Sequence, residues 1–154
     1  MLLTGTYKRS IDDKQRIAIP KKIRDQIAAS AQPNLLYVAP GTDGSLVLYT
    51  EESFSRLGEQ LAEGSPTGQD VRAFSRLFYS QAESLELDSQ GRVRIPPELW
   101  QLANLGKEAV LVGVRDHLEL WDANRWQAYL IEKQSHYDEL AERAFRSSAT
   151  PNGR

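Results

Sequence analysis

Apolar and polar residues alternate with a period of two in four short segments, which come as two pairs. The pairs are residues 7–11 with 16–19, and residues 85–87 with 92–95. Each pair flanks a polar turn of four or five residues, so the pattern predicts two β-hairpins. Pro20 and Pro96 end the second strand of each pair, and the fixed φ of proline suits the first turn of a short helix through Ile23 or Leu99.

Another strand pair follows each predicted short helix. In the first half, residues 36–38 and 46–49 enclose Asp43-Gly44, a dipeptide that supplies positive φ in a tight hairpin turn. Thr50 and Asp122 have the side-chain oxygens of helix N-caps. Each half is therefore predicted to have the order β-β-α-β-β-α.

The two halves are copies of one unit. Residues 10–20 recur as residues 86–96, at a spacing of 76 positions. Both copies keep an aspartate, an arginine four positions later, and then an Ile-Pro dipeptide. A period of this size is typical of the duplication of a small unit, and here the duplication covers almost the whole chain.

Helical periodicity predicts two helices between the units and one after them. The first two span about residues 53–63 and 69–80, on either side of a Gly-Ser-Pro-Thr-Gly segment. Apolar residues spaced from Trp126 to Phe145 predict one long amphipathic helix, and the polar end of the chain has nothing to bury. The predicted boundaries are unit 1 at residues 5–51, a helical connector at 52–80, unit 2 at 81–124, the C-terminal helix at 125–147 and a flexible tail at 148–154.

The composition excludes several classes of protein. The 154 residues contain 40% apolar and 26% charged side chains, which suits one globular domain or two small coupled ones. No apolar run approaches the ~18 residues of a bilayer span, and the N-terminus lacks the pattern of a secretion signal, so we expect a protein that stays inside the cell. Because the chain has no cysteine and only two histidines, His117 and His136, we expect no metal site and no cofactor.

Charge is distributed unevenly along the chain, although the formal net charge is only −2. The first 24 residues carry seven cations against two aspartates, whereas the remaining 130 carry 12 cations and 19 anions. A local basic patch acts within a Debye length, whatever charge the distant regions carry. The N-terminal segment is therefore the candidate surface for nucleic acid.

The twin Asp-x-x-x-Arg turns, each followed by Ile-Pro, make the sequence resemble the MraZ family. The second copy, residues 87–99, matches the family motif almost position by position, and the resemblance covers roughly residues 1–146. It implies an α+β fold of two tandem swapped-hairpin (SpoVT/AbrB-like) β-barrel units, which form a pseudo-twofold pair with flanking helices. The first copy has Gln15 where the family carries glycine. A left-handed turn there would be strained by ~1 kcal/mol or more, unless the first turn differs in geometry from the second.

The resemblance also implies a function: a DNA-binding transcriptional regulator that is cytoplasmic and nucleoid-associated. Such proteins assemble into ring-shaped homo-oligomers and bind repeated short boxes in double-stranded promoter DNA. The boxes lie upstream of the operon for cell division and cell-wall synthesis, which includes the regulator's own gene. Neighbouring subunits on successive boxes would gain affinity through effective concentration. The helices around Phe74 and Trp126 offer apolar faces for this assembly or for the intrachain core.

Candidate DNA contacts lie in and beside the two turns. An arginine can fork onto O6 and N7 of guanine in the major groove, while other cations hold phosphates. The candidates are Arg16, Lys14, Arg9, Lys8, Arg92 and Arg94. The residues expected to shape the turns and strand ends are Asp12, Asp88, Gly91, Pro20 and Pro96. Because acidic residues surround Arg92, we expect the first unit to contact DNA and the second mainly to pack and assemble.

Catalysis and protein binding are the alternatives to DNA binding. Catalysis is disfavoured, because no serine lies in a nucleophile-elbow pattern and no glycine-rich run precedes a Lys-Ser or Lys-Thr pair. Neither histidine belongs to a ligand-spaced cluster, so we expect His117 in a turn and His136 on a helix face to be structural or solvent-facing. The alternative that stays open is an antitoxin-type module that uses the same fold to hold a protein partner.

Overall fold

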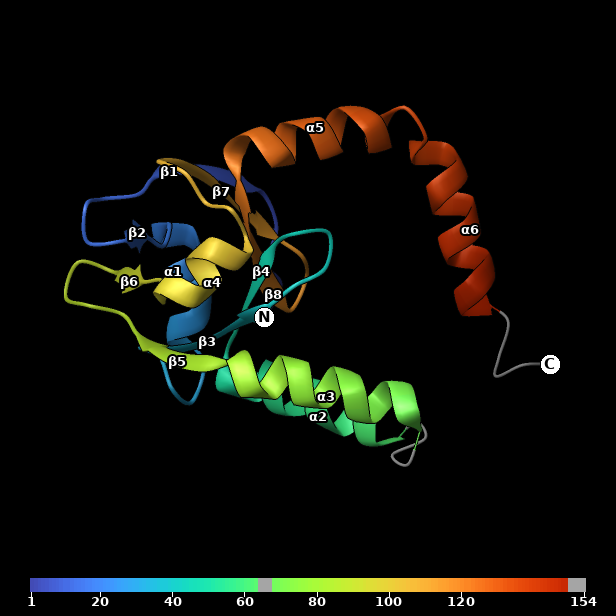
Figure 1. The fold of residues 1–154 in the computed structure, drawn as a ribbon, viewed down its shortest axis with the longest axis horizontal. Helices are drawn as coiled ribbons and strands as arrows, with labels where there is room; N and C mark the ends of the chain where they lie inside the picture. The colour runs from blue at the N-terminus through green and yellow to red at the C-terminus, as the bar shows by residue number, and fades with distance from the viewer. Residues whose placement is uncertain (64–67, 150–154) are drawn as a thin grey trace. The chain divides into compact units, whose positions relative to one another are not determined.

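The computed structural model describes residues 1–63 and 68–149 (Figure 1). Its elements fall into two compact units, Met1–Ala123 and Asn124–Arg154. The first unit contains strands β1 to β8 and helices α1 to α4, and the second contains almost all of α5 and the whole of α6. Residues 64–67 of the predicted connector and residues 150–154 of the predicted tail lie outside the described residues.

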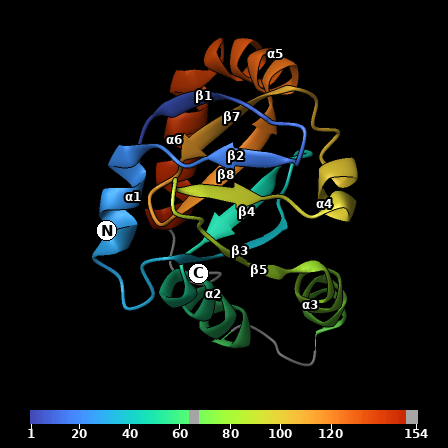
Figure 2. The same ribbon diagram turned by 90° about the vertical axis from the view of Figure 1, so that its left-hand side faces the viewer.

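Six strands form one antiparallel sheet in the order β1, β7, β8, β4, β3, β5. Their bounds are Thr6–Ser10 (β1), Glu108–Gly113 (β7), His117–Asp122 (β8), Leu46–Tyr49 (β4), Leu35–Pro40 (β3) and Glu83–Glu86 (β5). The strands β2 (Arg16–Ala18) and β6 (Arg92–Arg94) form a separate antiparallel pair, here called the ribbon. In Figure 2 the ribbon lies in front of the large sheet, with its two strands side by side.

Strand pairing crosses between the two repeats, so the two predicted local hairpins are wrong. β1 pairs with β7 instead of β2, and β5 pairs with β3 instead of β6. Alternation along a strand fixes which residues face the core but not which strand lies next to it. Pairing β2 with β6 buries Ile17 and Val93, which are 0% and 1% exposed. Because the six-stranded sheet is open, the described residues also form no closed β-barrel.

The hairpin predicted around Asp43-Gly44 does form. β3 and β4 pair antiparallel, and the Ser45 N–H donates to the Thr42 carbonyl oxygen across the turn at 3.1 Å. Asp43 and Gly44, with φ of 58° and 80°, are the two central residues, as a type I′ turn requires. The corresponding strands of the second repeat, β7 and β8, pair in the same way.

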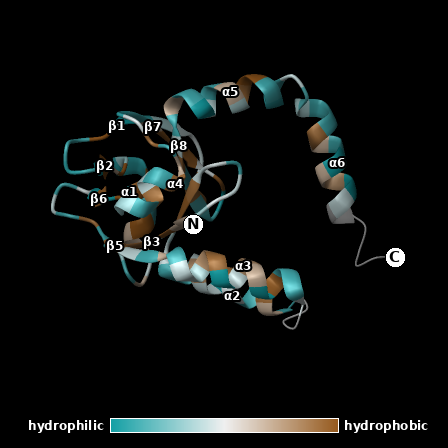
Figure 3. Cartoon of the chain, in the orientation of Figure 1, coloured by the Kyte–Doolittle hydropathy of each residue, from teal (hydrophilic) through white to brown (hydrophobic). Residues whose placement is uncertain are grey.

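The large sheet carries apolar residues on both faces. On the ribbon side, α1 (Lys21–Ala28) and α4 (Pro97–Leu102) bury Ile23 and Leu99 in one cluster with the strands. On the opposite face, α2 (Glu51–Glu63) and α3 (Gln69–Gln81) cover a smaller cluster that includes Val47 and Phe78. Figure 3 shows hydrophobic colouring along the central strands, whereas the turns that lead into β2 and β6 are mostly hydrophilic.

The starts of α1 and α4 agree with the predictions to within one residue, whereas α2 and α5 each begin two residues earlier than predicted. Pro20 and Pro96 occupy the N-cap positions of α1 and α4, one position earlier than the predicted first turn. Thr50 caps α2, since its Oγ1 accepts a 3.2 Å hydrogen bond from the N–H of Ser53. The Asp122 carboxylate accepts a 3.2 Å hydrogen bond from the N–H of Gly106.

The predicted long C-terminal helix is two helices, α5 (Ala123–Gln134) and α6 (Tyr137–Ala149). At the break, the Ser135 hydroxyl donates to the Glu132 carbonyl oxygen at 2.7 Å, and the His136 N–H donates to the Lys133 carbonyl oxygen at 3.0 Å. These local bonds replace the i to i−4 hydrogen bonds of an α-helix. The helical backbone is therefore interrupted here, although the helical spacing of apolar side chains continues. Among residues 1–63 and 68–149, no helix combines the length and apolar character needed to cross a bilayer.

Candidate nucleic-acid interface

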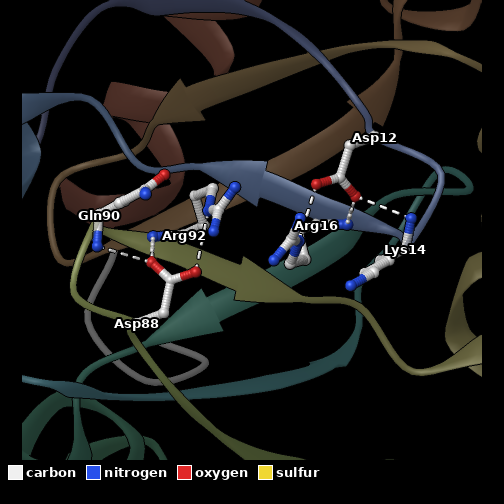
Figure 4. Close-up of polar contacts among 6 residues, drawn as sticks. All are labelled: Asp12, Lys14, Arg16, Asp88, Gln90 and Arg92. Atoms are coloured by element: carbon white, nitrogen blue, oxygen red, sulfur yellow. Dashed lines mark hydrogen bonds and ion pairs between the residues drawn. The ribbon is translucent and has the colours of Figure 1, made fainter.

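The turn that leads into β2 is built around the carboxylate of Asp12 (Figure 4). Its Oδ1 accepts hydrogen bonds from the backbone N–H groups of Lys14 at 2.9 Å and Arg16 at 2.8 Å. Its Oδ2 accepts a 2.7 Å bond from Nε of Arg16, so one side chain fixes both the loop and the arginine. Asp12 therefore closes the turn, which is the structural role predicted from the sequence.

The turn that leads into β6 repeats this geometry with Asp88. The backbone N–H groups of Gln90 and Arg92 and the Nε of Arg92 each lie 2.9 Å from an Asp88 carboxylate oxygen. Hydrogen bonds from the backbone amide of the arginine, outweighing partial desolvation, lower the pKa of both Asp12 and Asp88 below the usual range. Both aspartates are thus ionised at neutral pH and can hold a guanidinium in place.

Gln15 and Gly91 occupy the same position in the two turns, and both have positive φ, 62° and 74°. The turn geometry at Gln15, which the sequence left open, is therefore left-handed. The carbonyl oxygen of each residue accepts a bond from the other repeat, from Ile95 N–H to Gln15 at 3.0 Å and from Ile19 N–H to Gly91 at 2.9 Å. The two turns are consequently tied to opposite ends of the ribbon.

The ribbon presents three arginines on one face. Its register places Arg16 opposite Arg94 and Ala18 opposite Arg92, while Ile17 and Val93 point into the core between them. Side chains directly opposite in an antiparallel pair lie on the same face. Figure 4 shows the Arg16 and Arg92 side chains lying over the ribbon, each on the side of its own aspartate.

These arginines keep hydrogen-bond donors available. Arg16 and Arg92 each use Nε to bind an aspartate, with side chains 29% and 27% exposed. Within the described part of the chain, no side-chain or backbone group pairs with their terminal nitrogens, or with any nitrogen of the exposed Arg94 guanidinium. The face can therefore donate to acceptors on a ligand such as guanine or phosphate.

The other three predicted contacts do not all lie beside the ribbon arginines. Lys14 is exposed in the first turn, next to Arg16. Arg9 reaches the ribbon edge, where its Nε donates to the Ala18 carbonyl oxygen at 3.1 Å. Lys8 pairs with Val110, while its neighbour Arg9 pairs with Ala109 of the ribbon-side core, so Lys8 faces the opposite side of the large sheet.

Arg24 on α1 is a residue whose role sequence reasoning missed. The sequence alone indicates only that it shares a short helix with Lys21 and Lys22, where a solvated face is the simplest interpretation. Its Nε donates to the Ile19 carbonyl oxygen at 3.1 Å, and its side chain lies against the second turn, where a Cβ on Gly91 would come within 2.5 Å of Arg24 Cδ. Only the glycine at 91 hinted at a close neighbour, and nothing in the sequence identified Arg24.

His117 lies at the start of β8, partly buried, in a structural setting. Its ring stacks on Tyr49 with centroids 4.9 Å apart, and its Nδ1 lies 2.9 Å from Asp116 Oδ1. Burial by itself lowers the pKa of His117, but the carboxylates of Glu119 and Asp116 outweigh it and raise that pKa. Across residues 1–63 and 68–149 no group of three potential metal ligands converges.

The class of protein follows from this geometry: an α+β chain of two tandem repeats that joins one strand of each repeat into an arginine-bearing ribbon. A family model described as "MraZ protein, putative antitoxin-like" matches residues 2–77 and again residues 78–147. The chain belongs to the MraZ family, which confirms the resemblance inferred from the twin motifs.

Curated relatives agree over nearly their full length. The transcriptional regulator MraZ of Ligilactobacillus salivarius is 39% identical over 141 residues, which are 92% of this chain and 95% of that protein. That of Lactiplantibacillus plantarum is 40% identical over 138 residues, 90% of this chain and 94% of the relative. That of Mesoplasma florum is 34% identical over 146 residues, 95% of this chain and 97% of the relative.

Proposed function

We propose that this chain is a sequence-specific, DNA-binding transcriptional regulator whose ribbon binds double-stranded DNA. The observation that carries the proposal is the exposed face on which Arg16, Arg92 and Arg94 project together, two of them anchored by ionised aspartates. Relatives over 90% or more of the chain are named transcriptional regulators, which supports the same conclusion. We propose no catalytic role.

The mechanism rests on the fit of a two-stranded ribbon to the major groove. That groove is about 12 Å wide and admits such a ribbon, with side chains of one face turned to the base edges. An arginine that forks onto guanine O6 and N7 contributes about 1–3 kcal/mol of discrimination. Because Asp12 and Asp88 already hold Arg16 and Arg92, less side-chain entropy is lost on binding. Lys14, at the rim, supplies a phosphate contact.

Both repeats contribute to the proposed surface. The sequence predicts different roles for the two units, because acidic residues surround Arg92 along the chain. In that prediction the first unit contacts DNA and the second mainly packs and assembles. The pairing of β2 with β6 places Arg92 and Arg94 on the same face as Arg16, which favours one shared surface. We therefore propose DNA contacts from both strands of the ribbon.

Assembly would multiply these few contacts. Three arginines and one lysine on each chain bind weakly alone, and linked copies on neighbouring boxes raise affinity without new contact types. We propose a ring-shaped homo-oligomer on repeated promoter boxes upstream of a cell-division and cell-wall gene cluster, with a cytoplasmic, nucleoid-associated location. The pseudo-twofold, swapped-hairpin (AbrB-like) arrangement is part of this proposal, and the matching Asp12 and Asp88 turns support it.

The test is fluorescence anisotropy with labelled DNA from upstream of the chain's own gene, at two salt concentrations. Arg16→Ala and Arg92→Ala should each weaken binding by about 5- to 150-fold. Arg56→Ala is the matched control, because Arg56 is an exposed cation on α2, across the sheet from the ribbon, and should bind like the parent. Failure of the parent protein to bind any promoter fragment at low salt would overturn the proposal. A chain that is retained by a protein bait but not by DNA would favour the antitoxin-type function.

A further inference from the structure

The residues on the outer face of the ribbon are related by a near-twofold symmetry, which one residue breaks. The repeat maps Arg16 onto Arg92 and Ala18 onto Arg94, at the same spacing of 76 residues. In the antiparallel register these four residues form two opposite pairs, Arg16 with Arg94 and Ala18 with Arg92. Three corners of the face therefore carry arginine, and the fourth carries alanine.

Neighbouring cations do not restore the symmetry. Lys14 lies in the turn before Arg16, so it adds charge at the end that already holds Arg16 and Arg94, whereas its counterpart is the neutral Gln90. Arg9 lies near the alanine corner, but its Nε and Nη1 donate to the carbonyl oxygens of Ala18 and Lys8 at 3.1 and 2.8 Å. Its fork is thus committed to the backbone, while Arg94 is exposed and keeps its whole guanidinium for a ligand.

We infer that Arg94 is the residue that fixes the direction in which the ribbon lies on DNA. This inference rests on the proposed function. A ribbon with equivalent corners would contact a box equally well after a half-turn about its pseudo-twofold axis. With arginine at position 94 and alanine at position 18, one orientation gains a bidentate guanine contact that the other lacks. That contact makes the preferred orientation about 5- to 150-fold more populated, so the ribbon reads a non-palindromic box.

The absence of cysteine allows a direct measurement of orientation. Ser89 is exposed in the second turn, and Ser89→Cys gives the full-length chain a single attachment point for an iron–EDTA cleavage reagent. On a fragment that contains one box selected from random DNA by the parent protein, cleavage should fall on one flank only. The ratio of cleavage on the two flanks reports the orientation.

Three variants in the Ser89→Cys background test whether Arg94 causes the one-sided cleavage. Arg94→Ala makes the corners equivalent, so the flank ratio should fall toward one. Combining Ala18→Arg with Arg94→Ala moves the arginine to the opposite corner, so cleavage should shift to the other flank. Arg94→Lys keeps the charge without the planar fork, so it should retain the salt dependence of binding but lose most of the flank preference. Equal unfolding temperatures of the variants exclude a folding defect as the cause.

The outcomes separate the two proposals. One-sided cleavage that persists unchanged in Arg94→Ala overturns the role of Arg94 while leaving DNA binding intact. A parent protein that selects no box from random DNA overturns the proposed function and this inference with it. If the double variant does not fold, the Arg94→Ala and Arg94→Lys ratios still decide the matter, because both changes lie at an exposed position.

Discussion

Replacing Gln15 by glycine tests how much the left-handed backbone of the first turn lowers the free energy of unfolding. Gln15 has φ 62°, where its counterpart in the second turn is Gly91 with φ 74°. A side chain in the left-handed region costs roughly 1–2 kcal/mol, whereas glycine costs roughly 0.5–1 kcal/mol through the greater entropy of the unfolded chain. Gln15→Gly should therefore raise the free energy of unfolding by about 0.5–1 kcal/mol, or the Tm by about 1–4 °C.

Two companion variants make the comparison internal. Gln15→Ala keeps a Cβ at the same φ and should stay within about 0.5 kcal/mol of the parent. Gly91→Ala should destabilise by about 1–3 kcal/mol, because the new Cβ adopts positive φ and comes within 2.5 Å of Arg24 Cδ.

The assay is urea unfolding followed by circular dichroism, with all four proteins at one concentration because self-association would shift apparent stability. The predicted order of stability is Gln15→Gly, then the parent with Gln15→Ala, then Gly91→Ala. A Gln15→Gly protein no more stable than Gln15→Ala would refute the assignment of strain to this residue.

The remaining predictions concern charge. Lys14→Ala should reduce the slope of the logarithm of the DNA-binding constant against the logarithm of the salt concentration by about 0.9. Lys8→Ala should leave that slope unchanged, because Lys8 faces the other side of the sheet. A salt titration of DNA binding measures both slopes, and equal effects of the two variants would contradict the placement of Lys8 away from the DNA. Asp12→Asn removes the anionic anchor of Arg16 and should weaken box binding several-fold by anisotropy, with Asp13→Asn as the neighbouring control. Folding raises the pKa of His117, so its protonated form stabilises the fold fully below its unfolded pKa of about 6.5, and the effect disappears as the pH rises through the folded pKa. The stability gap between the parent and His117→Gln should thus be larger at pH 5.5 than at pH 8.5 in urea unfolding, and a gap that grows with pH would contradict this.

Local chemistry was predictable from the sequence where one residue decides it. The aspartate that closes each turn, the turn at Asp43-Gly44 and the Thr50 cap all follow from short-range hydrogen bonding or backbone sterics. The two helices between the repeats also follow from apolar spacing, at Glu51–Glu63 and Gln69–Gln81.

Long-range pairing was not predictable in the same way. A strand such as residues 16–18 alternates identically whether it pairs with its own neighbour or with the equivalent strand 76 positions away. Because of that ambiguity, the sequence did not predict the shared face of Arg16, Arg92 and Arg94. The break at Ser135 was missed because apolar periodicity records side-chain spacing and not backbone hydrogen bonds. The DNA contacts themselves stay predictions.

Methylation interference on a promoter box tests the central claim most directly. Dimethyl sulfate methylates N7 of guanine in the major groove, where the fork of an arginine would bind. We predict that methylated guanines in the box block binding by the parent protein, and that Arg16→Ala loses the interference at one of these guanines while keeping it at others. Binding that tolerates every N7-methylated guanine, in the parent as in the variant, would contradict recognition by the ribbon arginines.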